Sequence, residues 1–416
     1  MNQTKSMQLL AKAERLIPAA TQTYSKGPSY FIKGVSPVFM ESGAGCYVQD
    51  VDGNTYCDYI LALGPITLGY KYPAVDKAIR KQLAKGINFS LPTELEVELA
   101  ELMQQVIPCA EKMRLSKTGT EVTSAAIKAA MAYTGREHIA QFGYHGWASW
   151  YSITTDRPAG IPAVYKTLIH PFKYNDLQSL ETIFNEYSIA AVIMEPVQFA
   201  PPAQGFLDGV KYLCHKNGAV LILDEMITGF RLDLGGAQKY FGITPDLATF
   251  GKGMANGMPL AALVGKREIM DVFDISGHAH FSTTFGGEAL SIAACIATIK
   301  EMRDKDTPGH IARMGTRLMK RMSSIQGLTM SGYPYRPIPI FPAGLSPEEE
   351  RIHRSLLMQE LCKRGQLIHS GGLNLCYMHK EEDIDKTALA FAESMDLINA
   401  NKVKLEGEPI RPTFKR

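Results

Sequence analysis

The chain has 416 residues, of which 45% are apolar and 21% charged, so it can bury a large core and is long enough for two or three domains. Its 44 basic residues nearly balance its 42 acidic ones, which argues against the basic excess of a nucleic-acid-binding protein. No run approaches the ~18 consecutive apolar residues of a membrane span. The N-terminus carries Lys12, Glu14 and Arg15 where a signal peptide has an apolar core, so we expect a cytoplasmic protein.

The seven cysteines are scattered, odd in number and never paired as Cys-x-x-Cys. We therefore expect buried thiols rather than a disulfide framework. The histidines also lack the spacing of a metal-binding motif, so the sequence predicts no metal site.

In chain order, the first 20 residues predict a short amphipathic helix, and residues 44–60 predict a β-hairpin that turns at Asp52-Gly53. Apolar residues at helical spacing predict helices over 93–105 and 121–134.

Two short apolar runs, 190–194 and 219–223, are followed by Glu195 and Asp224. Such runs are typical of parallel strands buried on both faces, and the helical stretches between them predict βαβ units. Ligands of open α/β sheets bind at the carboxyl ends of strands, which makes both acids candidate functional residues.

After about residue 305 the pattern changes to helices around the Pro-rich and aromatic segment YPYRPIPIFP, which predicts a smaller α+β domain. We expect residues 1–55 to pack with this small domain, residues 56–305 to form a large α/β domain with a mostly parallel central sheet, and residues 306–416 to form the small domain.

Several segments have both a functional and a structural interpretation. Thr118, Gly119 and Thr120 open a helix, where they could form a phosphate site or an ordinary N-cap. The segment 142–151, FGYHGWASWY, could stack aromatic rings on a flat ligand or belong to the core. The turn at 281–288, FSTTFGGE, could contribute further phosphate contacts or be a turn only.

Two charged residues carry similar alternatives. Asp224 at a strand end could accept a hydrogen bond from a buried cationic nitrogen or cap a helix. Lys252 lies between two glycines, where it could be a desolvated Schiff-base amine or a solvated loop lysine.

The order and spacing of these segments are far more specific than any one of them. They run as Gly-Thr-Glu (119–121), Tyr-His-Gly (144–146), Glu-Pro (195–196), Asp-Glu-x-x-Thr-Gly-Phe-Arg (224–231), Gly-Lys-Gly (251–253) and Thr-Phe-Gly-Gly (284–287). This set resembles the class III aminotransferases that depend on pyridoxal phosphate, and above all their glutamate-1-semialdehyde aminomutase branch. The likeness runs from about Tyr47 to Ala289, with a weaker match at residues 381–387.

The resemblance implies a fold type I transferase that works as a homodimer with shared active sites and binds pyridoxal 5'-phosphate. Lys252 would form the Schiff base with the cofactor and move the proton, and Asp224 would pair with the protonated pyridine nitrogen. The other cofactor-binding roles implied are phosphate binding by Thr118, Gly119 and Thr120, stacking by Tyr144, packing on the opposite ring face by Met226, lining of the pocket by His145 and Glu195, and a phosphate contact from the partner subunit by Thr284.

The sequence departs from the aminomutase pattern at two places. Phe39 follows Ser36-Pro37-Val38 where a substrate-binding arginine is expected, and the stretch SGGLNLCYMH has Asn374 near the position of a gating glutamate. We therefore expect an aminotransferase that uses a separate amino donor, by family resemblance L-glutamate, and a carbonyl acceptor; the alternative is an aminomutase-type isomerase.

The aromatic cluster of Trp147, Trp150 and Tyr151 favours a keto- or aldehydo-sugar as acceptor, as in surface-polysaccharide biosynthesis. A second substrate carboxylate would need a cation. The sequence leaves Arg157, Arg231 and Arg336 open for that role.

Overall fold

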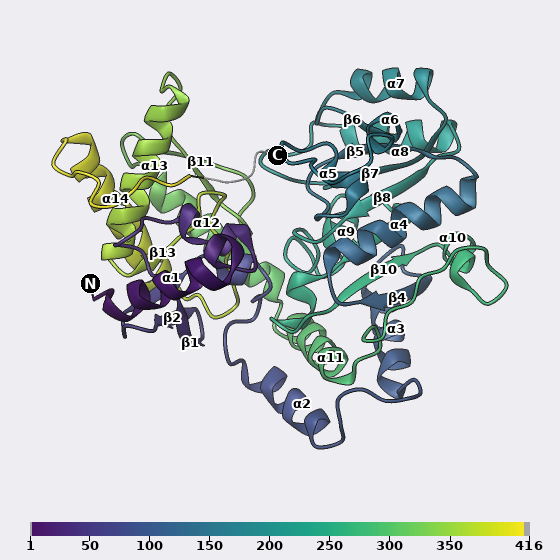
Figure 1. Ribbon diagram of the computed structural model, residues 1–416, viewed down its shortest axis with the longest axis horizontal. Helices are drawn as coiled ribbons and strands as arrows, with labels where there is room; N and C mark the ends of the chain where they lie inside the picture. Colours follow the sequence, from purple (N-terminus) through teal and green to yellow (C-terminus); the bar gives the residue numbers. More distant parts are fainter. Residues whose placement is uncertain (1, 412–416) are drawn as a thin grey trace. The chain divides into compact units, whose positions relative to one another are not determined.

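A computed structural model describes residues 2–411 of the chain (Figure 1). The chain folds into two compact units: one contains the residues up to Tyr72 together with those from Gly309 onward, and the other runs from Pro73 to Pro308. The domain boundaries predicted from the sequence lie at residues 55/56 and 305/306, whereas the two units divide at 72/73 and 308/309.

The second unit is built on a seven-stranded sheet of order β4-β10-β9-β8-β7-β5-β6. All of these strands run parallel except β10, which is antiparallel to both of its neighbours. The strands are β4 (Lys112–Ser116), β5 (His138–Phe142), β6 (Ile169–Pro171), β7 (Ile189–Met194), β8 (Val220–Asp224), β9 (Leu247–Phe250) and β10 (Ala261–Gly265). The mostly parallel central sheet predicted from the sequence is thereby confirmed.

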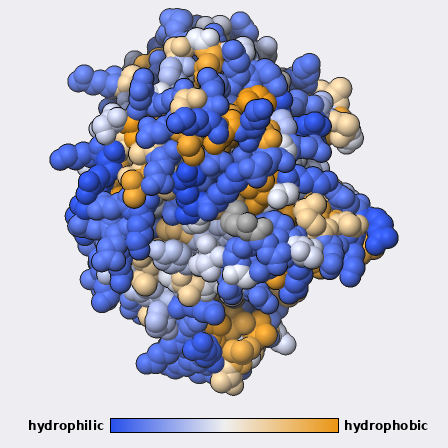
Figure 2. All heavy atoms as spheres, turned by 90° about the vertical axis from the view of Figure 1, so that its left-hand side faces the viewer, coloured by the Kyte–Doolittle hydropathy of each residue, from blue (hydrophilic) through white to orange (hydrophobic). Residues whose placement is uncertain are grey.

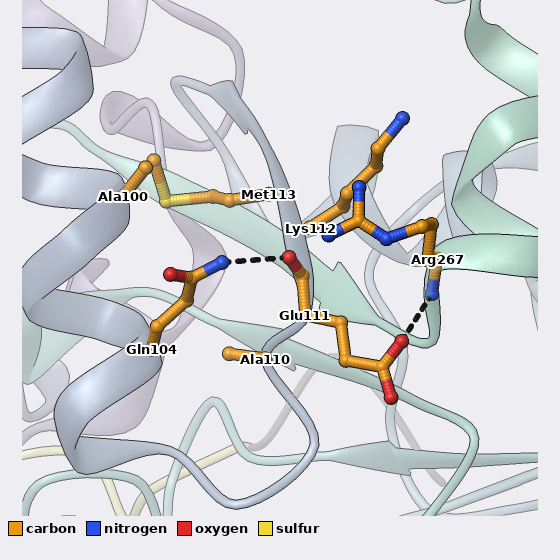
Figure 3. Close-up of a pocket in the computed structure, with 7 residues that line it drawn as sticks. All are labelled: Ala100, Gln104, Ala110, Glu111, Lys112, Met113 and Arg267. Carbon is orange, nitrogen blue, oxygen red and sulfur yellow. Dashed lines mark hydrogen bonds between the residues drawn. The ribbon is translucent and has the colours of Figure 1, made fainter.

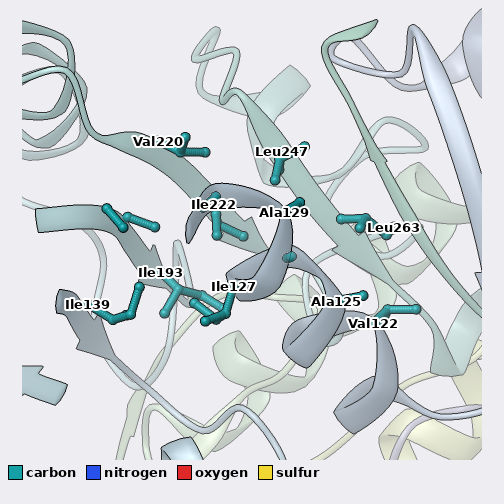
Figure 4. Close-up of a cluster of buried hydrophobic side chains, with 14 of the residues drawn as sticks. Val122, Ala125, Ile127, Ala129, Ile139, Ile193, Val220, Ile222, Leu247 and Leu263 are labelled. Atoms are coloured by element: carbon teal, nitrogen blue, oxygen red, sulfur yellow. The ribbon is translucent and has the colours of Figure 1, made fainter. Parts of the chain in front are cut away.

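Both faces of this sheet are covered, which explains why its central strands read as continuous apolar runs. In β8, Val220 and Ile222 pack on one face in a cluster with helix α4, whereas Leu221 and Leu223 pack on the other with α8. Figure 4 shows α4 lying across the first of these faces. The helices of this unit are α2 (Pro73–Leu83), α3 (Glu94–Val106), α4 (Gly119–Thr134), α5 (Ser149–Ser152), α6 (Tyr165–Leu168), α7 (Leu177–Glu186), α8 (Phe206–Lys216), α9 (Gly236–Tyr240), α10 (Arg267–Met270) and α11 (Ala289–Asp304), with 3₁₀ turns η5 (Lys252–Ala255) and η6 (Asp271–Phe273).

The first unit contains a four-stranded sheet of order β1-β2-β3-β13. The predicted hairpin is confirmed, because β2 (Tyr47–Asp50) pairs antiparallel with β3 (Thr55–Asp58). The remaining strands are β1 (Met40–Ala44), β11 (Thr329–Ser331), β12 (Ile338–Ile340) and β13 (Gln366–Leu367). The helices are α1 (Thr4–Leu16), α12 (Thr307–Met322, which begins just before the unit boundary), α13 (Pro347–Lys363) and α14 (Glu381–Asn399), with 3₁₀ turns η1 (Pro18–Ala20), η2 (Tyr24–Lys26), η3 (Pro28–Tyr30) and η4 (Leu61–Leu63).

Within residues 2–411, no helix is both long enough and apolar enough to cross a bilayer. The face of the molecule drawn in Figure 2 is mostly hydrophilic, with small separate hydrophobic areas. The cytoplasmic location expected from the sequence stays a prediction.

Candidate active site

Three candidate residues lie at the carboxyl ends of neighbouring parallel strands. Glu195 directly follows β7, Asp224 is the last residue of β8, and Lys252 comes two residues after β9. Side chains at this edge of an open α/β sheet are placed to meet a ligand. Asp224 and Glu195 are buried, and Lys252 is partly buried.

Polar groups hold the Asp224 carboxylate from both sides. Its Oδ2 lies 2.7 Å from Nδ1 of the buried His145, and its Oδ1 accepts hydrogen bonds from the Thr249 hydroxyl at 3.1 Å and the Met226 amide at 3.1 Å. The Met226 bond closes a turn, and β8 leads into this turn rather than into a helix. The helix-cap interpretation of Asp224 is therefore wrong.

The second nitrogen of His145, Nε2, lies 3.0 Å from the carbonyl oxygen of Phe142. Both ring nitrogens thus face acceptors, which hold the imidazole between the Asp224 carboxylate and the backbone at the end of β5. Trp150 covers the imidazole, with the ring centroids 5.9 Å apart and the planes nearly parallel.

The loop that carries Tyr144 and His145 is fixed to the first turns of α4. The Thr123 hydroxyl donates to the carbonyl oxygen of His145 at 2.9 Å, and Thr120 Oγ1 accepts the Trp147 amide at 3.3 Å. Gly146 has φ +101°, and a Cβ there would lie 2.0 Å from Thr120 Oγ1. The Tyr-His-Gly sequence thus needs its glycine, because α4 approaches the backbone too closely for a side chain.

Glu195 acts on the same loop from the other side. Its Oε2 accepts hydrogen bonds from the Tyr144 amide and from the Gln198 side chain, both at 2.9 Å. The structure therefore gives Glu195 a role in holding the loop backbone.

Met226 connects the start of α4 to the segment before Lys252. Ideal Cβ atoms on Gly119 and Gly251 would lie 3.0 and 2.7 Å from its sulfur, so a side chain at either position would make the Met226 side chain shift. Lys252 itself has φ +42°, a left-handed conformation that costs a non-glycine residue about 1–3 kcal/mol and is concentrated at functional sites.

The N-cap interpretation of Thr118 is confirmed, since Thr118 and Glu121 form a reciprocal capping box at the start of α4. Burial opposes ionisation of Glu121, but hydrogen bonds from Ser116 and Thr118 outweigh it and lower the pKa of this carboxyl. The first-turn amides of Gly119 and Thr120 still lie where an α-helix has no acceptor of its own, so an anion can bind there as well.

Thr284 is exposed, in the turn that precedes α11. Among the described residues, no hydrogen bond joins it to the other candidate residues. Its neighbour Phe285 is 57% exposed, and Glu288, four residues on, caps α11 and pairs with Lys117 at 2.9 Å.

The aromatic segment divides into two groups. Trp150 and Tyr151 are buried, and the Trp150 indole donates to the Ser124 hydroxyl at 3.1 Å. The core interpretation therefore holds for these two rings. Trp147 is 78% exposed and Tyr144 37% exposed, so only they present aromatic surface.

The three candidate arginines also differ in burial and in hydrogen-bond partners. Arg231 is buried, and its Nη1 donates to the carbonyl oxygens of Ile227 at 2.6 Å and Met226 at 3.4 Å, so it supports its own turn. Arg157 is exposed. Arg336 belongs to the first unit and donates to the Gly371 carbonyl oxygen at 2.7 Å.

Thr123 and Thr249 contribute to this site, although neither was among the candidate residues predicted from the sequence. Thr249 is a polar residue inside the short buried strand Leu247–Phe250, and that signal could have identified it. Thr123 carries no comparable signal, because threonine is ordinary in the first turns of a helix.

A separate hollow of about 260 Å³ lies between α3, β4 and α10 (Figure 3). Its polar groups already bond one another: the Gln104 side chain donates to the Glu111 carbonyl oxygen at 2.7 Å, and the Arg267 amide donates to the Glu111 carboxylate at 2.9 Å. None of its lining residues belongs to the candidate active site.

Comparisons with known proteins agree with this arrangement. Residues 30–330 match the family model described as aminotransferase class-III. The chain is 36% identical to the glutamate-1-semialdehyde 2,1-aminomutase of Alkaliphilus oremlandii, over 94% of this chain and 98% of that protein. It is equally identical, at 36%, to the 3-aminobutyryl-CoA aminotransferase of Cloacimonas acidaminovorans, over 94% and 96%.

Among solved structures, the FumI protein of Sphingopyxis sp. MTA144, in its PLP internal aldimine form, superimposes with a TM-score of 0.90 at 25% identity. The match covers 97% of this chain and 99% of FumI. A glutamate-1-semialdehyde aminomutase from Pseudomonas aeruginosa shares the fold, with a TM-score of 0.84 at 22% identity over 94% of both chains.

Proposed function

The chain belongs to the class III aminotransferase family and has pyridoxal 5'-phosphate as its cofactor, and from this premise we propose that it transfers an amino group between two separate small molecules. The buried Asp224 carboxylate, which His145 and Thr249 hold at the end of β8 next to the strand that leads to Lys252, supports the cofactor chemistry. The observation that favours two separate substrates is Asn374 near the position where an aminomutase has a gating glutamate. When bound, the cofactor supplies an electron sink for negative charge at the substrate carbon.

The residues present fit this cofactor. An ionised Asp224 can hold the proton on the pyridine nitrogen, and the Lys252 amine can attach the cofactor and then move the substrate proton. The first-turn amides of α4, at Gly119 and Thr120, suit the phosphate together with the Thr118 hydroxyl.

Four further residues complete the proposed binding site. Tyr144 would stack on one face of the ring, and Met226, packed against two glycines, would cover the other. His145 and Glu195 would act indirectly: His145 holds the Asp224 carboxylate in position, and Glu195 holds the backbone of Tyr144.

Transfer between two substrates is favoured over an intramolecular amino shift because an aminomutase must retain one intermediate behind a gate. Asn374 stands near the expected gating position, and its side-chain amide donates to the Ile60 carbonyl oxygen at 3.0 Å. The aminomutase activity is the second candidate, and the 36% identity to a glutamate-1-semialdehyde aminomutase favours it.

Spectral titration of the purified enzyme with L-glutamate separates these two functions. We expect glutamate to bleach the absorbance of the lysine-attached cofactor and to release one equivalent of 2-oxoglutarate per active site, because the first half of a transamination needs no acceptor. The matched sample receives glutamate-1-semialdehyde alone. Its conversion to 5-aminolevulinate, with glutamate leaving the spectrum unchanged, would establish the aminomutase instead.

For the acceptor we propose a keto- or aldehydo-sugar, with Trp147 as its contact surface, because Trp150 and Tyr151 lie in the core. An exposed indole can cover the apolar face of a sugar ring while its edge stays in water. We expect Trp147→Ala to raise the KM for a keto-sugar about 10-fold, and to leave the glutamate half-reaction unchanged. Turnover with simple keto acids and with none of the free or nucleotide-linked keto-sugars would refute this acceptor class.

We also propose that the enzyme is a homodimer in which Thr284 serves the partner's active site. Thr284 and Phe285 are exposed, and the Ala289 amide of the same segment donates to the Ile87 carbonyl oxygen at 2.9 Å. Ile87, Phe89 and Leu91 add exposed apolar surface beside it, as expected of a buried interface. Light scattering should give twice the mass of the 45.8 kDa chain, and a monomeric, fully active enzyme would contradict the shared site.

A further inference from the structure

Three buried side chains of the first unit meet although they are far apart in the sequence. They are Cys46, just before β2; Cys57, in β3; and His379, just before α14. The two sulfurs and one imidazole nitrogen all lie within 4.8 Å of one another. Thiolate and imidazole are the groups that Zn²⁺ prefers in proteins.

The two ring nitrogens of His379 differ in their hydrogen bonding. Its Nδ1 lies 3.1 Å from the Cys376 amide and 3.3 Å from the Cys376 sulfur, whereas Nε2 is buried and has no hydrogen-bond partner among the described residues. When the Cys376 amide donates to Nδ1, the ring proton sits on Nε2 as a buried, unsatisfied donor, which is an unfavourable arrangement.

The other tautomer moves the unsatisfied donor from Nε2 to the Cys376 amide, which then loses Nδ1 as its acceptor. When Nδ1 carries the proton and donates it to the Cys376 sulfur, Nε2 presents a lone pair. That is the arrangement of a metal-bound histidine, whose second nitrogen donates to an outer group.

A carboxylate adjoins the same cluster. Asp383 Oδ2 lies 3.6 Å from the Cys46 sulfur and accepts the Lys380 amide at 2.9 Å, and Oδ1 accepts the Tyr47 hydroxyl. These bonds fix the carboxylate in the first turn of α14, beside the thiols.

We propose that Cys46, Cys57 and His379, with Asp383 as the fourth ligand, bind a structural Zn²⁺ ion. A tetrahedral site with Zn–S bonds of about 2.3 Å has ligand atoms about 3.5–3.8 Å apart. The atoms of Cys46, Cys57 and His379, which lie within 4.8 Å of one another, must therefore close in on the ion, and Asp383 must approach from beside the Cys46 sulfur. The two thiols lose their protons to solvent when the ion binds, and two thiolates and one carboxylate then surround the dication.

Such an ion would join the β2–β3 hairpin to the start of α14. Cys46 and Asp383 are 337 residues apart in the sequence, so the ion would tie the N-terminal and C-terminal parts of this unit together. The site lies outside the candidate active site, and its role would be in stability rather than in the reaction.

Metal content and cobalt substitution of the full-length holoenzyme test this site. We expect about one zinc per chain after purification without chelator. Replacement by Co²⁺ should give the visible ligand-field bands and the thiolate-to-metal charge-transfer band of a tetrahedral thiolate site. Removing the ion should lower the thermal midpoint of the wild-type chain, and Zn²⁺ should restore it.

The decisive variants are Cys46→Ser and Cys57→Ser, which should weaken the charge-transfer band, and Cys362→Ser, which should keep it. Cys362 is the matched control because it is buried in the same unit, in α13, and its sulfur faces the Val35 carbonyl oxygen. Circular dichroism confirms that each variant is folded.

Co²⁺ uptake by the wild-type protein tests the zinc site even if both ligand variants fail to fold. A folded wild-type chain that takes up no Co²⁺ with a thiolate band would overturn the proposal. So would a band that survives in folded Cys46→Ser and Cys57→Ser, or a disulfide between these two cysteines in the purified enzyme.

Discussion

Lys252→Ala is expected to lower kcat by about 10⁴-fold or more and to abolish the absorbance of the lysine-attached cofactor. The side-chain amine is the proposed attachment point and proton carrier, and alanine supplies neither function. The left-handed φ of +42° at this position also costs alanine as much as lysine, so the backbone gains no relief. Stopped-flow turnover with glutamate, together with the cofactor spectrum, measures both losses.

Lys266→Ala is the matched control for that experiment. Lys266 lies in the same unit and pairs with Asp246 at 2.6 Å, away from the strand ends that carry the candidate residues. Its loss should lower stability, because Asp246 is buried and loses a partner, and should leave the spectrum intact. If Lys252→Ala kept the attached-cofactor band, another lysine would be the attachment point, and the assignment of the site would be wrong.

Asp224→Asn is expected to lower kcat/KM about 10³-fold while the cofactor stays attached through Lys252. The amide carries no charge, so it cannot stabilise a proton on the pyridine nitrogen, and the electron sink is weakened. The same change removes the charge that His145 faces at 2.7 Å. We therefore expect the pH dependence of the cofactor spectrum to change together with the rate.

Asp246→Asn controls for the loss of a buried carboxylate in the same sheet. Asp246 is buried and accepts the Leu221 amide at 2.8 Å, so its replacement should lower stability. It should leave the rate per folded enzyme and the spectral pH dependence unchanged, because it precedes β9 rather than following a strand. A wild-type spectrum and rate in Asp224→Asn would mean that this carboxylate does not serve the cofactor.

Helices and strands could be predicted from the sequence where their characteristic residue patterns lie within a short segment. The apolar runs before Glu195 and Asp224 predicted β7 and β8, because a strand buried on both faces has no polar positions. The segment 118–120 was expected to open a helix, and its N-cap interpretation depends only on residues a few positions apart. The order and spacing of the motifs between residues 119 and 287 pointed to the cofactor and, by family resemblance, to Lys252.

Burial and hydrogen-bond partners that depend on residues distant in the chain became known only from the three-dimensional structure. Trp147 and Trp150 are three residues apart, yet only Trp150 is buried, because its indole meets Ser124 of α4. Arg231 was open to a substrate role in the sequence, but its guanidinium binds the carbonyl oxygens of its own turn.

The contact between Asp224 and His145 and the cluster of Cys46, Cys57 and His379 both join residues that are distant in the chain. Asp224 and His145 are 79 residues apart and meet only because the loop after β5 folds across the carboxyl end of β8. Cys46 and Cys57 meet His379 only because the hairpin and the segment before α14 fold into the same unit. Spacing along the chain carries no trace of such pairs, since burial and partners are set by how the strands and helices pack.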